Sequence, residues 1–195
     1  MSTALTIIRD EHQTISAVLH GMEYLVREIR AGKKIEPRVF HAMLYYLDTF
    51  GERVHHPKED RYLFGIIRQR STEAGALIAI LEEEHAAGAA AIRRLTQAMI
   101  RFEEGGDKEF AAFEREVHNY AESYRNHMRR EEEQLFPLAR SLLTPFDWVM
   151  VDTAFKENPD PLAFARETSD FEALFSRIVN LAPPPIGLGP EAKPR

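Results

Sequence analysis

The segments His-His-Pro-Lys-Glu at residues 55–59 and His-Met-Arg-Arg-Glu at residues 127–131 each place a glutamate four residues after a histidine. On a helix, residues four apart lie on the same face, about one turn from each other. Each histidine therefore projects together with its glutamate. A neutral imidazole beside a carboxylate can form half of a transition-metal site. The two copies indicate the two halves of a dinuclear centre built on helices.

Each of these segments also follows a single histidine, and the spacing repeats along the chain. His12 and His85 are 73 residues apart, and the two His-x-x-x-Glu segments are 72 residues apart. This period is too long for a solenoid repeat and instead predicts two helix hairpins. Each hairpin supplies one histidine from its first helix and a histidine with a glutamate from its second. We therefore expect six metal ligands to converge: His12, His55, Glu59, His85, His127 and Glu131.

Apolar residues recur at three-to-four spacing through most of the chain, which is typical of amphipathic helices. The pattern and its breaks predict four long helices, at about residues 5–30, 37–70, 71–104 and 107–143. Pro57 lies inside the second of these helices, where it removes a backbone hydrogen bond and predicts a bend beside His55 and Glu59. The sequence thus predicts an all-α fold, an antiparallel up-down-up-down four-helix bundle with short loops, in which metal sites form between facing helices.

We expect three parts along the chain: the bundle at residues 1–144, a C-terminal helical extension at 145–181 and a Pro-rich tail at 182–195. The extension is predicted to hold two short helices, at about 146–155 and 162–181. Its aromatic residues indicate that it buries a surface, on the bundle or on a second subunit of a homodimer: Phe146, Trp148, Phe155, Phe164, Phe171 and Phe175. The tail is predicted to be flexible.

Composition excludes several classes of protein. The chain has 195 residues, of which 44% are hydrophobic, which suits one domain with a sizeable core. A net charge of −6 without a basic stripe argues against nucleic-acid binding. No apolar run approaches the roughly 20 residues that span a membrane, and the N-terminus lacks the features of a signal peptide. The absence of cysteine excludes disulfides, thiolate ligands and iron–sulfur ligation. We expect a cytoplasmic protein.

A second metal pattern must be weighed, because ferritin-like di-iron proteins use Glu-x-x-His on two helices. Residues 52–55 and 82–85 both fit that motif. They lie on the consecutive second and third helices, however, and Tyr124 stands where the fourth helix would need a glutamate before His127. The His-x-x-x-Glu pattern is symmetric between the two halves, so we favour it.

The remaining histidines and the nearby acidic residues are expected to lie outside the ligand set. Helical geometry places His20 and His118 off the ligand face and His41 in another layer of the bundle. His56 points about 100° away from His55, which favours a supporting or surface role. The acidic residues beside the lone histidines, Asp10, Glu11 and Glu84, either orient ligands or are solvated helix charges, and we favour the second interpretation.

With these motifs, residues 5–140 resemble the hemerythrin-like, or HHE cation-binding, proteins. The resemblance implies a four-helix bundle around two non-haem iron ions (Fe²⁺/Fe³⁺) that are joined by carboxylate and oxo or hydroxo bridges. Glu59 and Glu131 would bridge the ions, and the four histidines of the ligand set would be terminal ligands. Oxygen-carrying hemerythrins have a further histidine four residues after the one on the third helix, and here that position is Ala89.

The resemblance and the open position at Ala89 indicate a protein that binds or senses oxygen or nitric oxide without being an enzyme. Two alternatives stay open. One is a di-iron enzyme or iron donor that reduces nitric oxide or peroxide or repairs damaged iron centres. Turnover would need an electron source, and no Gly-x-Gly-x-x-Gly motif for a nucleotide cofactor is present. The other is a structural or storage bundle that holds zinc or exchangeable iron.

Overall fold

The structure is a computed structural model that describes residues 2–157, 178–191, 193 and 194. Apart from two short strands and the turns and loops that join the elements, the described residues are helical, and this confirms the predicted all-α class. The elements in chain order are α1 (Thr3–Arg30), β1 (Lys33–Lys34), α2 (Pro37–Tyr46), η1 (Leu47–His55), α3 (His56–Lys58), η2 (Glu59–Phe64), α4 (Gly65–Arg70), α5 (Gly75–Gly105), α6 (Asp107–Arg130), η3 (Glu131–Leu135), α7 (Phe136–Leu142), α8 (Pro145–Glu157) and β2 (Lys193–Pro194).

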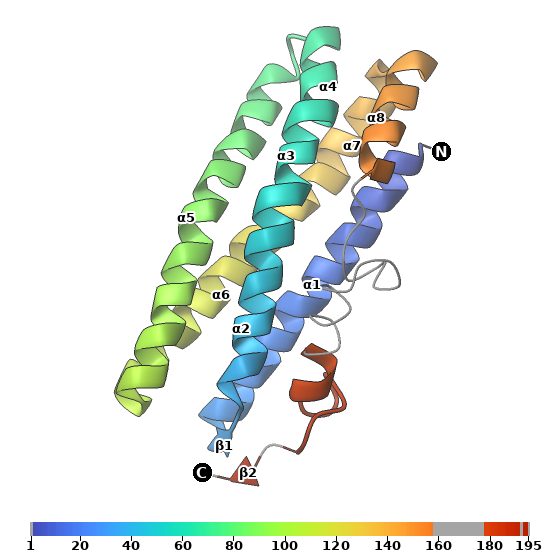
Figure 1. Cartoon of the computed structure of the whole chain (residues 1–195). Helices are drawn as coiled ribbons and strands as arrows, with labels where there is room; N and C mark the ends of the chain where they lie inside the picture. Colours follow the sequence, from blue (N-terminus) through green and yellow to red (C-terminus); the bar gives the residue numbers. More distant parts are fainter. Residues whose placement is uncertain (1, 158–177, 192, 195) are drawn as a thin grey trace.

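Four long helical rods lie side by side (Figure 1). The first is α1, the second runs without a break from α2 through α4, the third is α5, and the fourth runs from α6 through α7. Short connections join them. Two of these turn at glycines with left-handed backbone angles, Gly32 with φ of 81° and Gly106 with φ of 67°. Glycine adopts this conformation without the Cβ clash that other residues suffer.

The second and fourth rods switch to π-helical hydrogen bonding beside the His-x-x-x-Glu segments. The segment η1 ends at His55, η2 begins at Glu59, and η3 begins at Glu131. Pro57 lies between the first two, in the three-residue α3. Proline has no N–H to donate, and the α-helical pattern is interrupted on both sides of Pro57. The bend expected there stays a prediction. π-helical turns of this kind are frequent at functional sites.

The apolar core has two clusters, one toward each end of the rods. One contains Leu25, Phe40 and Phe113, and the other contains Ile8 and Phe136. Along the first three rods, the histidines and glutamates of the predicted ligand set fall between the positions of one cluster and those of the other. In the fourth rod Glu131 does so too, and His127 lies at the edge of the first cluster, next to Met128. The polar residues therefore lie in a layer that is closed on both sides by side chains that exclude water.

The helix α8 packs beside the start of α1 (Figure 1). Asp152 of α8 accepts hydrogen bonds from the Ser2 hydroxyl and the Ala4 backbone N–H, both at 2.7 Å. A carboxylate at this position satisfies free N–H groups at a helix start and complements the helix dipole. The first predicted helix of the extension is thus present as α8. Most of the second, with Phe164, Phe171 and Phe175, lies outside the described residues.

The described part of the C-terminal tail contacts the bundle. Ile178 and Ala182 are buried in the cluster that contains Phe40, and Ile186 packs against it. The strand β2 pairs antiparallel with β1, so that Lys33 is opposite Pro194. The flexibility expected for residues 182–195 stays a prediction.

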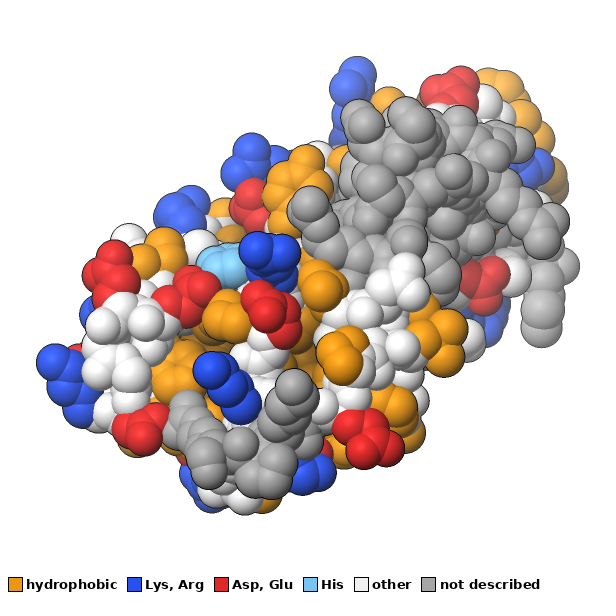
Figure 2. Space-filling view, turned by 60° about the horizontal axis from the view of Figure 1, so that its bottom comes forward, with side chains coloured by type: hydrophobic (Ala, Val, Ile, Leu, Met, Phe, Trp, Pro, Cys, Tyr) orange, Lys and Arg blue, Asp and Glu red, His pale blue; other side chains and the backbone are white. Residues whose placement is uncertain are grey.

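On the face shown in Figure 2, acidic and basic side chains are interspersed, with apolar side chains between them. None of the described helices is both long enough and apolar enough to cross a membrane.

Candidate metal centre

The six residues singled out by their spacing come together in the middle of the bundle. His12, His55, Glu59 and Glu131 have ligand atoms that all lie within 4.8 Å of one another. The same holds for a second group, Glu59, His85, His127 and Glu131. Each group takes one histidine from each of two rods, and both groups share the two glutamates. All six side chains are buried, and the two glutamates are 0% exposed.

The Nε2 atoms of the four histidines face the two glutamates. Nε2 of His12 lies 3.2 Å from Oε2 of Glu131, and Nε2 of His55 lies 3.5 Å from Oε2 of Glu59. In the other half, Nε2 of His127 lies 3.5 Å from Oε1 of Glu131 and 3.0 Å from Nε2 of His85. These atoms surround one small space, and they are the atoms with which histidine and glutamate bind metals.

The opposite ring nitrogen, Nδ1, of each of the four histidines is held by a carboxylate from another rod. Those of His55 and His127 lie 2.7 Å from Glu11 and 2.9 Å from Glu84. The other two contacts join His85 to Asp60 at 2.8 Å and His12 to Glu132 at 2.9 Å. A carboxylate on Nδ1 fixes the ring orientation and leaves Nε2 as the metal-binding nitrogen. The favoured interpretation of Glu11 as a solvated charge was wrong, because Glu11 is 1% exposed.

Two buried carboxylates, Glu59 and Glu131, have oxygens without hydrogen bonds in the described part of the chain. Among the described residues, neither oxygen of Glu59 or Glu131 has a hydrogen-bond partner, nor does Nε2 of His12 or His55. Burial and the neighbouring Glu131 raise the pKa of Glu59 well above its usual range. Burial also lowers the pKa of His12, but its contacts with Glu131 and Glu132 outweigh burial and raise this pKa to about 9.

The donor set fits divalent cations. Buried carboxylates are costly unless a counter-charge compensates them. His127 and His12 compensate Glu131 in part, and cations between Glu59 and Glu131 would compensate both. Imidazole nitrogen and carboxylate oxygen together suit iron, manganese or zinc, while softer metals prefer the sulfur ligands that this site lacks. The orphaned oxygens and Nε2 atoms therefore support a metal cofactor held between the rods.

The family model of the hemerythrin HHE cation-binding domain matches residues 3–139, which is most of the bundle and well over half of the chain. The chain belongs to the hemerythrin HHE cation-binding family. A search of curated proteins finds no match to the sequence. The family and the buried groups of histidine and glutamate agree in indicating metal binding.

A cavity of about 200 Å³ adjoins the His127 side of this HHE domain's site. Its lining includes His127, His56, Glu52, Tyr120 and Tyr124. The Tyr120 hydroxyl donates a hydrogen bond of 2.8 Å to Glu52, and burial raises the pKa of Glu52 to about 7. His127 thus belongs both to the candidate metal centre and to the lining of a space large enough for a small molecule.

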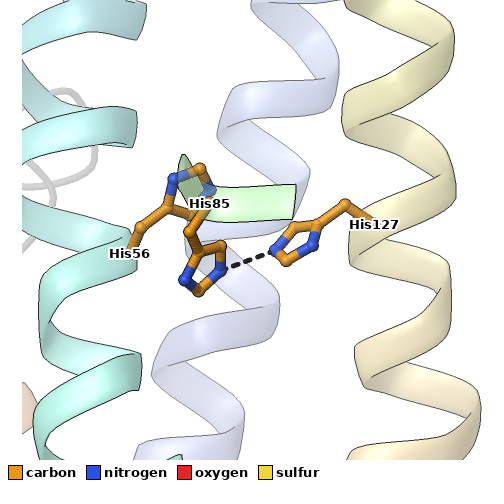
Figure 3. A group of neighbouring side chains, drawn as sticks. All are labelled: His56, His85 and His127. Carbon is orange, nitrogen blue, oxygen red and sulfur yellow. Dashed lines mark hydrogen bonds between the residues drawn. The ribbon is translucent and has the colours of Figure 1, made fainter. Parts of the chain in front are cut away.

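Sequence reasoning did not place His56 beside the centre of this HHE domain. His56 is 4% exposed, so the surface position considered for it is wrong. Its ring lies beside those of His85 and His127, and the three ligand atoms fall within 4.8 Å of one another (Figure 3). The available signal was the His-His dipeptide at 55–56, which the 100° rotation per residue led us to discount.

The other excluded residues lie outside the centre. His20 and His41 are both exposed, and His41 pairs with Glu103 at 2.8 Å. His118 is 69% exposed. The rival ferritin-like motif is not assembled, because Glu82 pairs with Arg68 at the surface, 2.7 Å away.

Proposed function

We propose that this chain is a non-haem di-iron protein that binds or senses a small diatomic ligand, oxygen or nitric oxide. The observation that carries the proposal is the arrangement of two buried groups of imidazole and carboxylate donors that share Glu59 and Glu131. In this proposal His12 and His55 would hold one iron ion, His85 and His127 would hold the other, and Glu59 and Glu131 would serve both. Bound ferrous ions would supply the electrons that a diatomic ligand accepts.

The protein's own residues would control the site in three ways. The outer carboxylates, such as Glu11 and Glu84, orient the imidazoles and raise their basicity. The apolar clusters above and below the polar layer exclude water, which favours binding of a neutral diatomic molecule over water-driven side reactions. The cavity beside His127 offers a space from which such a molecule reaches the metal.

The arrangement of the rods, the cellular location and the oligomeric state are also inferred from the sequence. The four rods run up, down, up and down, as their short connections favour. The protein acts in the cytoplasm, since a chain without cysteine forms no disulfide and does not require an oxidising compartment. Two copies form a homodimer through the C-terminal extension. On α8, Phe146 is 72% and Val149 63% exposed, and these side chains support that contact.

The experiment that tests the function is metal analysis with optical spectroscopy. Protein is purified without oxygen, its metals are quantified, and spectra are recorded before and after exposure to oxygen or nitric oxide. About two irons per chain with a ferric charge-transfer band or a nitrosyl spectrum would support the proposal. Continued consumption of nitric oxide or peroxide with a supplied reductant would favour the enzyme alternative. Zinc, or metal without any response to gas, would favour the structural bundle.

A further inference from the structure

His56 is a buried histidine whose two ring nitrogens both lack a hydrogen bond among the described residues. It lies on α3 and faces the interior between the rods, next to His85 of α5 and His127 of α6 (Figure 3). A neutral imidazole buried without any partner forfeits its hydrogen bonds to water, which is unfavourable. We therefore expect the ring to bind a partner when the centre holds its metal ions.

The surroundings of His56 resemble those of the four proposed ligands in one respect, a carboxylate near Nδ1, although here it comes from the same rod and makes no hydrogen bond. Its Nδ1 lies 3.3 Å from a carboxylate oxygen, Oε2 of Glu52, which is one helical turn earlier. Glu52 is held in turn by the Tyr120 hydroxyl. Nδ1 of His56 thus faces a carboxylate, as in the other four histidines, and Nε2 is the nitrogen left for a metal.

The space for this arrangement is provided by a glycine on the facing helix. A Cβ at Gly88 would approach Oε2 of Glu52 to 2.6 Å, closer than real contacts allow. Glycine at this position of α5 therefore lets the Glu52 carboxylate reach the site. The next residue is Ala89, at the position where oxygen-carrying hemerythrins have a further histidine. The helix α5 therefore supplies no second imidazole there.

The second hairpin has no equivalent of His56 and Glu52. At 72 residues further along the chain, the period of the ligand repeat, stand Met128 and Tyr124. Methionine sulfur is a poor donor for iron. The asymmetry places an additional imidazole on one side of the centre only, the side of His85 and His127.

We propose that His56 is a third imidazole ligand of the ion held by His85 and His127, with Glu52 as its orienting carboxylate. This inference rests on the dinuclear site proposed above and deepens it. One ion then has two histidines and the other has three. The ion with three lies beside the cavity, so His56 also limits the space that an incoming ligand finds there.

Packing alone is the competing explanation of His56. Its ring stacks on His85, with centroids 4.1 Å apart and planes inclined by 13°, and also on Tyr124 at 5.2 Å. Stacking accounts for the burial of the ring. It leaves Nε2 without a hydrogen bond and unexplained, because a phenyl ring would stack equally well without a nitrogen. This difference determines the choice of variants.

The test is anaerobic titration of metal-free protein with Fe²⁺ against a competing chelator, which resolves the affinities of two ions. His56→Phe keeps an aromatic ring on His85 but cannot bind metal, and His56→Ala leaves a hole. We expect both variants to bind one ion as tightly as the wild type and the other at least tenfold more weakly, since even indirect ligand support is worth 10- to 100-fold. Removal of the exposed His118 by substitution with Ala should change neither affinity.

Added imidazole separates ligation from packing. It should restore the weakened affinity in His56→Ala, where it can enter the hole, and not in His56→Phe, where the phenyl ring fills it. Wild-type affinities in both variants would overturn the assignment. So would weakened binding that imidazole fails to restore in His56→Ala, because His56 would then act by packing. A wild-type protein that binds no Fe²⁺ would instead overturn the dinuclear proposal, and the assignment with it.

Discussion

Nδ1 of His127 lies 2.9 Å from Oε2 of Glu84, the residue directly before the ligand histidine of α5. Glu11 stands directly before the ligand histidine of α1 and meets Nδ1 of His55 at 2.7 Å. In each hairpin, the first helix thus carries its own histidine and, one residue earlier, the carboxylate that orients the histidine of the second helix. The repeat extends beyond the six proposed ligands to the groups that position them.

Replacement of Glu84 by Ala should weaken iron binding at the His127 side by about 10- to 100-fold, because the imidazole loses the partner that fixes its orientation. Chelator competition with Fe²⁺ measures this change. The matched control is Glu83→Ala, which removes an exposed carboxylate next to it. Equal affinities in the two variants would show that the Glu84 contact does not support the site.

The helices and the six central residues could be predicted because both depend on local spacing. Three-to-four periodicity defines a helix, and a four-residue step places His127 and Glu131 on one face. The contacts of Glu11 and His56 could not be predicted in this way. Each joins residues of different rods, and the sequence does not specify how the rods rotate against one another. The π-helical turns add to this, because they change the angle per residue on which the facing argument for His56 relied.

His127→Ala and Glu131→Ala should each reduce bound iron below the two ions per chain expected of the wild type. They should also lower the melting temperature of the iron-loaded protein, because metal binding adds to the free energy of folding. Metal analysis and calorimetry on protein reconstituted with Fe²⁺ measure both effects. His118→Ala is the control, since this side chain is 69% exposed and distant from the centre. Full iron content in both variants would contradict the six-ligand assignment.

Glu59→Gln and Glu131→Gln should have opposite effects on the metal-free protein. Burial and the Glu131 charge raise the pKa of Glu59, so the metal-free fold loses stability as the pH rises through that pKa. Glutamine has no charge to bury, so Glu59→Gln should raise the free energy of unfolding at pH 8 by on the order of 1 kcal/mol. This gain corresponds to a rise in melting temperature of about 2–4 °C.

Glu131 differs because charged neighbours compensate it. Burial raises the pKa of Glu131, but His127 and His12 outweigh burial and lower it. Glu131→Gln removes that attraction and should lower the melting temperature of the metal-free protein. Both variants should bind less Fe²⁺ than the wild type. Thermal unfolding in the presence of a chelator tests the pair, and a shift of the same sign in both would contradict the charge asymmetry.

Asp147 joins the start of α8 to the end of α4, and its substitution by Asn should destabilise the protein by a few degrees. Asp147 accepts a hydrogen bond of 2.9 Å from the Thr144 N–H and a two-pronged contact of 3.0 and 2.8 Å from Arg70. The residues Thr144 and Asp147 form a capping box, since the Asp147 N–H lies 3.3 Å from the Thr144 hydroxyl.

The pH dependence of this effect has a definite sign. The hydrogen bond from Arg70 and those from Thr144 hold the pKa of Asp147 well below its usual range. A lowered folded-state pKa contributes stability that is present above the unfolded value of 3.8 and lost as the pH falls below it. The gap in melting temperature between wild type and Asp147→Asn should therefore be constant from pH 7 to about 5 and shrink below about 4. Asp10→Asn, at an exposed position, should leave the melting temperature unchanged.

Gly88→Ala should lower the affinity for the iron ion on the His127 side while leaving the helix intact. The new Cβ would meet the Glu52 carboxylate at 2.6 Å and push it away from His56. The backbone of α5 would not resist the change, because alanine is favoured over glycine inside a helix by roughly 1 kcal/mol. Gly75→Ala is the matched control: it lies on the same helix, and no atom lies within 4 Å of its added Cβ among the described residues. Titration with Fe²⁺ should show that one of the two ions binds more weakly to Gly88→Ala, whereas both bind to Gly75→Ala with wild-type affinity. Unchanged binding in both would mean that Glu52 does not position a metal ligand.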